Sequence, residues 1–170
     1  MRGKKGREHF DPADPPRRRA NKRRGRGTYE TDRPPVLGVI GRSSGQLRLR
    51  VVQDTKAGTL EGHVHRLTVA GCHVYTDEYD SYIGIQRQRS KVAHGLKEWA
   101  RDDDGDGIRE VHTNTAEGMW TGLRNFLRPF RGVSKHYLAG YVAIFECQVN
   151  SKRISPALIS ALVKVHSNDS

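Results

Sequence analysis

The sequence is poor in cysteine and in long apolar runs. Cys72 and Cys147 are its only cysteines and neither belongs to a CxxC pair, which argues against a disulfide scaffold and fits a reducing, cytoplasmic setting. The longest apolar stretch, Tyr137 to Phe145, contains a glycine and is far shorter than the roughly 20 residues that span a bilayer. We therefore expect a soluble protein that has no membrane partner.

Acidic residues are scarce relative to basic ones. The chain has 30 Lys and Arg against 19 Asp and Glu, a net charge of +11, and its first 35 residues hold 12 of the basic and 5 of the acidic residues. A cationic arm before a nearly balanced remainder indicates a polyanionic partner, most simply nucleic acid. A merely solubilising tail is the alternative. The candidate phosphate contacts in this arm are Arg17, Arg18, Arg19, Lys22, Arg23 and Arg24.

The composition divides the chain into three parts. Residues 1–34 are rich in Gly, Pro, Arg and Lys and offer few apolar side chains, which predicts a disordered basic arm or a long exposed loop. Residues 35–153 carry the apolar periodicity of an ordered domain. Residues 154–170 are expected to form a C-terminal helix and tail, because Ser155 and Pro156 suit the cap and first position of a helix.

The periodicity of the ordered part predicts an α/β fold. Residues 36–42 read as a buried strand, and residues 46–53 alternate as a half-buried strand does, so the two predict an antiparallel hairpin. Thr113 can cap a helix that runs to Leu127, and Ser134 opens another that runs to Asn150. The remaining expected elements are a helix at 55–70, strands at 72–75 and 90–94, a short helix at 79–85 and a charged loop at 95–112.

The run DDDGDG in this loop resembles part of a calcium-binding loop. Asp102, Asp104 and Asp106 occupy positions one, three and five of an EF-hand, but position twelve is Thr113 instead of a bidentate glutamate. No convincing helix precedes the loop. We therefore interpret the run as a solvated acidic loop.

Carboxylates at two distant points of the chain could act together. Asp77 follows the strand at 72–75, and the carboxyl ends of strands form the usual ligand crevice of α/β sheets. Asn114, Glu117 and Arg124 lie on one predicted helix, with Glu117 and Arg124 two turns apart on one face. Such oxygen ligands can hold divalent magnesium, and the cationic side chain of Arg124 could position a DNA phosphate. An ordinary surface helix with solvated charges is the alternative.

Two segments carry a resemblance to a known family. VYTDEYDSY and the later stretch from VHTNTAEGMWTGLRN to FECQVNSKR resemble the ISXO-two-like branch of insertion-sequence transposases. That family shows a strand ending in Thr-Asp and later a His-Thr-Asn-x-x-Glu-x-x-Trp block, a Gly-Val turn and a helix that closes on Asn. The match covers about residues 35 to 153.

The resemblance implies a ribonuclease-H-like mixed sheet flanked by helices, and DNA transposition with Mg2+ or Mn2+ as cofactor. Asp77 matches the second catalytic aspartate. Asn114 or Glu117 matches the third ligand, and the sequence leaves both open. Arg124 stands where the family usually has Lys, and His112 and Trp120 shape the site or contact DNA, with packing an equal alternative for Trp120. The implied partners are element ends, target DNA and other copies of the chain.

One departure from the family pattern bears on activity. The family's first aspartate lies in a Val-Asp-Glu-Thr-type strand ahead of a basic loop, and this chain starts within that loop. We therefore expect an N-terminally truncated domain that lacks the first strand and is poorly active or inactive alone. A non-catalytic DNA-binding protein derived from a transposase is the alternative.

Overall fold

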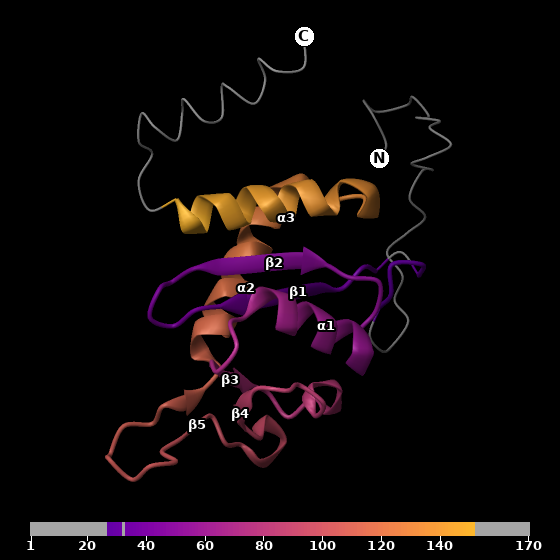
Figure 1. Ribbon diagram of the computed structural model, residues 1–170. Helices are drawn as coiled ribbons and strands as arrows, with labels where there is room; N and C mark the ends of the chain where they lie inside the picture. Colours follow the sequence, from indigo (N-terminus) through magenta and orange to yellow (C-terminus); the bar gives the residue numbers. More distant parts are fainter. Residues whose placement is uncertain (1–26, 32, 152–170) are drawn as a thin grey trace, which may run out of the picture.

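The computed structural model describes residues 27–31 and 33–151 as a mixed α/β structure (Figure 1). The predicted basic residues of the arm from Arg17 to Arg24 and the predicted C-terminal helix lie outside these residues. The elements are β1 (Val36–Ile40), β2 (Leu47–Val51), α1 (Ala57–Leu67), β3 (His73–Thr76), β4 (Gln88–Lys91), β5 (Ala100–Arg101), β6 (Val111–His112), α2 (Asn114–Leu127) and α3 (Lys135–Asn150), with single 3-10 turns η1 (Asp80–Tyr82), η2 (His94–Leu96) and η3 (Arg128–Phe130).

The predicted hairpin is confirmed and forms the centre of the structure. β1 and β2 pair antiparallel, with Gly38 opposite Leu49. Because side chains alternate across a strand, each of the two faces of the hairpin packs against a different apolar cluster. On one face, Leu47 and Leu49 pack with residues of α2 and α3, namely Met119, Leu123, Val142 and Phe145. On the other face, Leu37 and Val52 pack against α1 through Leu60 and Val64, together with Ile85.

The outer edge of β2 is closed by side chains of α3, which lies alongside it in Figure 1. The amide of Leu47 donates to Asn150 Oδ1 at 2.7 Å, and Asn150 Nδ2 donates to the carbonyl of Leu47 at 2.9 Å. The amide of Leu49 donates to Glu146 Oε2 at 2.6 Å. An unpaired strand edge is a pairing template, so these side chains occupy groups that would otherwise bind another strand.

The second half of the structure is built from shorter elements than the sequence predicts. β3 and β4 pair in parallel and β5 and β6 pair antiparallel, each in a sheet of its own. The helix predicted at 79–85 is only the turn η1. The strand predicted at 90–94 ends at Lys91, because the chain turns into η2 at His94. The loop predicted at 95–112 contains the two-residue strands β5 and β6.

The two predicted helix caps have different outcomes. The hydroxyl of Ser134 accepts from the amide of His136 at 3.4 Å, so Ser134 caps α3 as expected. Thr113 occupies the cap position of α2, and its carbonyl accepts from the amide of Glu117 at 3.0 Å, but its side chain makes no capping bond to the helix backbone. Its hydroxyl instead donates to Glu117 Oε1 at 3.1 Å, which corrects the predicted role and connects Thr113 to a candidate site residue.

Among the described residues, no helix has both the length and the apolar character needed to cross a membrane.

Candidate active-site cleft

A cleft of about 850 Å3 lies between the hairpin, β3 and the start of α2. All of β1 and all of β3 line it, and Val64 and Leu67 of α1 line it as well. Two of the predicted ligands, Asp77 and Glu117, and the predicted neighbours His112 and Trp120 also lie on its walls. The first and last of these four residues, Asp77 and Trp120, are 43 positions apart in the sequence and line the same cleft.

Asp77 follows directly on the last residue of β3, as predicted. It is exposed, and its Oδ1 accepts from the amide of Tyr79 at 3.2 Å. The hydroxyl of Tyr79 in turn donates to the carbonyl of Thr55 at 3.1 Å, which ties the turn after β3 to the segment before α1. One oxygen of Asp77 thus fixes the turn after β3.

Glu117 lies in the first turn of α2 and is held by two neighbours. Its Oε1 accepts from the hydroxyl of Thr113 at 3.1 Å and lies 3.6 Å from Nε2 of His94. His94 Nε2 also lies 3.2 Å from the Thr113 hydroxyl, and its ring packs at 5.1 Å from Trp99. The Glu117 side chain remains 58% exposed, so its carboxylate is oriented and still open to solvent.

The structure does not bring every predicted site residue to the cleft. Asn114, the first residue of α2, is exposed and is absent from the cleft lining. Arg124 is also exposed, lies near the far end of α2 and donates to Thr121 Oγ1 at 3.3 Å. Of the two candidates for the third ligand, only Glu117 therefore lies on the cleft wall.

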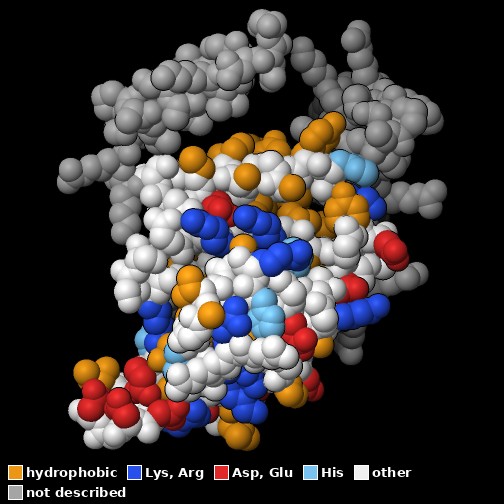
Figure 2. Space-filling model, viewed as in Figure 1, with side chains coloured by type: hydrophobic (Ala, Val, Ile, Leu, Met, Phe, Trp, Pro, Cys, Tyr) orange, Lys and Arg blue, Asp and Glu red, His pale blue; other side chains and the backbone are white. Residues whose placement is uncertain are grey.

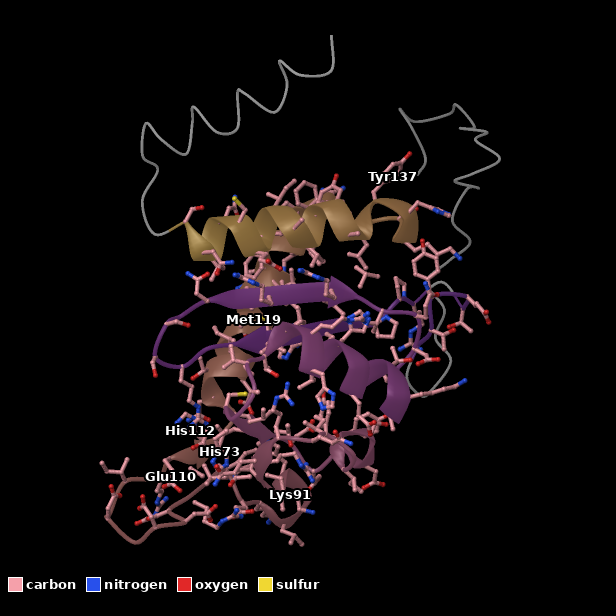
Figure 3. The ribbon with its side chains drawn as sticks, viewed as in Figure 1. His73, Lys91, Glu110, His112, Met119 and Tyr137 are labelled. Atoms are coloured by element: carbon pink, nitrogen blue, oxygen red, sulfur yellow. The ribbon has the colours of Figure 1, made fainter. Side chains whose placement is uncertain are left out.

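Arg42 connects the end of β1 to the strand before α2. Its guanidinium donates to the carbonyls of Glu110 and His112 and lies 3.7 Å from the centre of the Tyr75 ring. Figure 3 shows Glu110 and His112 near the start of α2. Burial lowers the pKa of Arg42, an effect opposed by Tyr75 and Glu110, but an arginine so placed stays charged. It supplies a fixed positive charge on the cleft wall.

His112 lies beside this charge. Burial, and secondarily the charge of Arg42, lower the pKa of His112 below 6.5. Its Nδ1 is buried and has no hydrogen-bond partner among the described residues. His112 is therefore a neutral side chain at physiological pH, able to donate or accept one hydrogen bond without adding charge to the cleft.

The chemistry of the cleft suits a hard cation only in part. Carboxylates are the ligands that magnesium prefers, and Asp77 and Glu117 both supply them. Within residues 27–31 and 33–151, however, the only three metal-ligating side chains with atoms within 4.8 Å of one another are Asp102, Asp104 and Asp106. Asp77 and Glu117 belong to no such group, so a metal ion held by them would need a further oxygen donor.

The three aspartates lie on the loop between β5 and β6, where Figure 2 shows acidic side chains gathered on a projecting tip. Each carboxylate is occupied by the loop itself. Asp102 accepts from the amides of Gly105 and Gly107, Asp104 from that of Asp106, and Asp106 from that of Ile108. The turns that these bonds form account for the loop without an ion.

Sequence reasoning missed two residues of the cleft. Arg42 follows an apolar strand, and a basic residue in that place is the signal that could have drawn notice. His94 has no such signal, because its approach to Glu117 depends on where η2 packs against the start of α2.

Comparisons with known proteins show the family of this chain. The family described as the ISXO2-like transposase domain matches residues 6–150. A protein in the transposable element ISH50 of Halobacterium salinarum is 36% identical over 153 residues, which cover 85% of this chain and 47% of that protein. The chain therefore spans about half the length of this curated relative.

A solved structure supports the fold class. The catalytic core domain of BIV integrase superposes with a TM-score of 0.50 and 12% sequence identity, covering 82% of this chain and 92% of that one. At this identity the likeness bears on fold alone, and it confirms the expected ribonuclease-H-like α/β class.

Proposed function

We propose, because this chain belongs to the ISXO2-like transposase family, that it is a DNA-binding domain whose cleft serves metal-dependent phosphodiester cleavage and strand transfer. The observation that carries this proposal is that Asp77 and Glu117 line one cleft although they come from separate elements. In this assignment residues 35–153 form the catalytic-type domain, residues 1–34 are a DNA-binding arm and residues 154–170 are an appended segment.

Asp77 and Glu117 are the proposed metal ligands, and Asn114 is a weaker candidate because it lies off the cleft wall. Mg2+ or Mn2+ held there would activate the attacking oxygen and stabilise the leaving one. The contacts of Thr113 and His94 keep the carboxylate of Glu117 in place. A carboxylate that is already oriented loses less conformational freedom when it binds a cation.

Positive charge in the cleft suits a DNA phosphate. Arg42 is fixed by its bonds to two carbonyls, and Arg48 also lines the cleft. Both line the same cleft as Asp77, so a phosphate that they hold would lie in the cleft that contains the proposed metal ligands. Arg124, on the outer part of α2, would contact DNA away from the reacting group, and several copies of the chain would be needed to hold two element ends.

The chain alone should cleave DNA slowly. Two-metal phosphoryl transfer needs a cluster of hard ligands, and Asp77 and Glu117 supply only two carboxylates. We therefore expect weak nicking of supercoiled DNA with Mn2+ and still weaker nicking with Mg2+.

The test compares nicking by the full chain with that by Asp77→Asn and Glu117→Gln, which keep size and remove charge. Asp104→Asn is the matched control, because it removes an exposed carboxylate outside the cleft. The proposal expects nicking to disappear in the first two variants and to persist in the control. Equal nicking by all four proteins would reject the site.

Non-catalytic DNA binding is the second candidate, and the net charge of +11 favours it. It predicts binding that weakens steeply with salt, needs no divalent metal and is unchanged by Asp77→Asn. Removal of residues 1–33 would then abolish most of the affinity. Binding that rises with Mn2+ and depends on Asp77 would instead favour the catalytic assignment.

A further inference from the structure

We propose that the outer face of α3 is a docking surface for residues 154–170 of the same chain, which would return over it as an antiparallel helix. The surface consists of described residues of α3, and the segment that would cover it lies outside the described residues. This inference is independent of the proposed function, because no residue of α3 lines the cleft.

The exposed face of α3 is unusually apolar. The opposite face packs on the hairpin through Val142 and Phe145, which are buried. None of the exposed residues of α3 is Asp, Glu, Lys or Arg. Tyr137 and Ile144 have 53% and 52% of their surface exposed, and Figure 3 shows Tyr137 on the side of α3 away from β2. In Figure 2, hydrophobic side chains gather along this helix. A helix that is apolar on both faces is normally buried on both.

The helix α2 shows how this chain builds a face that stays in water. It also packs one side against the hairpin, through Met119 and Leu123. Its exposed positions include the charged residues Glu117 and Arg124, as expected of a solvated helix face. The two helices share one apolar cluster and differ on their outer faces. The outer face of α3 is therefore suited to contact with an apolar partner.

The sequence that follows α3 has the pattern of such a partner. Leu158, Leu162 and Val165 follow one another at spacings of four and three residues, which places them on one side of a helix. Ser160 and Lys164 fall on the other side. The segment thus predicts an amphipathic helix whose apolar side needs a surface to cover.

The length of the chain fits a return over α3. The helix ends at Asn150, and residues 151–154 precede the predicted helix start, within the roughly two to eight residues that connect packed helices. A helix over residues 156–166 would be roughly 16 Å long. This is the length of α3 from Gly140 to Asn150, so the returning helix would cover most of the exposed face.

An antiparallel return also gives a definite register. Counted back from the connection, Leu162 would lie near Ile144, and Leu158 near Cys147. A Cβ on Gly140 would meet nothing within 4 Å, so this position leaves room for a second helix to approach α3 closely.

The other occupants fit this face less well. The basic arm, residues 1–34, is rich in Arg and Lys and has few apolar side chains. A second copy of the chain has to be recruited from solution. A segment joined to α3 by a short connection meets the face at an effective concentration in the millimolar range, so it competes well against a second copy.

The thiol of Cys147 reports whether the face is covered. It is exposed among the described residues, and Cys72→Ala leaves it as the only thiol of the chain. The rate of its reaction with the thiol reagent DTNB is measured in the full chain, with the urea-unfolded chain as the reference for an uncovered thiol. Docking predicts a slow reaction in the folded chain, because the rate depends on access to the sulfur.

Two pairs of substitutions separate the two sides of the segment. Leu158→Asp together with Leu162→Asp should speed the reaction roughly tenfold or more, because two leucines no longer bury their side chains. Ser160→Asp together with Lys164→Asp places two carboxylates on the other side and should leave the rate unchanged. Ile144→Asp on α3 should also speed the reaction, and adding Leu162→Asp to it should give little further increase, because both changes break one contact.

Four results would overturn the proposal. A reaction as fast as in the unfolded chain would show an uncovered face. A slow reaction that Leu158→Asp and Leu162→Asp leave slow would assign the cover to the basic arm. Protection that rises with protein concentration would assign it to a second copy. Independent effects of Ile144→Asp and Leu162→Asp would show that the segment packs elsewhere.

Discussion

Replacing Asn150 with alanine should destabilise the protein more than any other single change near the end of α3. The substitution removes the bond from the Leu47 amide at 2.7 Å and the bond to the Leu47 carbonyl at 2.9 Å. Leu47 is fully buried, with 0% of its surface exposed. Leaving a buried polar group unpaired costs roughly 1–3 kcal/mol, and water reaches part of this site because Asn150 ends its helix.

We therefore expect Asn150→Ala to lower the free energy of unfolding by about 2–3 kcal/mol. For a chain of this size the corresponding fall in Tm is about 4–12 °C. Urea unfolding followed by circular dichroism measures the free energy, and a thermal melt measures the Tm.

Two controls separate the loss of the two Asn150–Leu47 hydrogen bonds from a general effect on α3. Gln148→Ala changes an exposed residue of the same helix and should alter stability by less than about 0.5 kcal/mol. Asn150→Asp keeps an acceptor for the Leu47 amide but loses the donor, and should fall between the two. If Asn150→Ala is no more destabilising than Gln148→Ala, the hydrogen bonds of Asn150 do not stabilise the edge of β2 and the reasoning fails.

Three further predictions test the packing and the titrating groups. A Cβ on Gly38 would lie 2.7 Å from Met119 Cε and 3.0 Å from Leu49 Cδ2, so Gly38→Ala should lower the free energy of unfolding in urea by about 1–3 kcal/mol. Gly62→Ala on α1 is the control, because a Cβ there meets nothing within 4 Å, and it should raise the free energy of unfolding by up to about 1 kcal/mol. The hydrogen bond from Thr59, followed by that from the amide of Lys56, lowers the pKa of Asp54 below 3.8. The stabilisation of the folded state by the Asp54 carboxylate is therefore complete above pH 3.8 and is lost as the pH falls through the lowered pKa. Asp54→Asn should reduce the loss of stability in acid, and an unchanged dependence of stability on acid pH would contradict the assignment. Burial lowers the pKa of His112 below 6.5, so its ring should titrate below that value by NMR and stability should decline as the pH falls below 6.5; a midpoint at or above 6.5 would show that His112 is not buried beside Arg42.

The parts of the fold that follow from local pattern were predictable. The alternation of residues 46–53 predicts a strand with one buried face, and the spacing of Leu60 and Val64 predicts a helix with one buried face. Leu60 and Val64 are both buried, on α1. The short elements were not predictable to the same degree. β5 and β6 have two residues each, too few to show a periodicity in the sequence. A helix was predicted at 79–85, and only the single turn η1 is present.

The candidate site divides in the same way. The position of Asp77 after a strand and of Glu117 in the first turn of a helix was readable from the chain. Their placement on one cleft, which Asn114 does not line, depends on how α2 packs against β1. The contact of His94 with Glu117 also arises from tertiary packing, and no sequence spacing encodes it.

The most direct test of the central claim is a titration with Mn2+ followed by NMR line broadening. It is performed in a background carrying Asp102→Asn, Asp104→Asn and Asp106→Asn, so that the acidic loop cannot compete for the ion. If Asp77 and Glu117 share a metal, the amides of both residues should broaden together at the same Mn2+ concentration, and Asp77→Asn should abolish the broadening at Glu117. Broadening at only one of them, or broadening at Glu117 that survives Asp77→Asn, would contradict the claim.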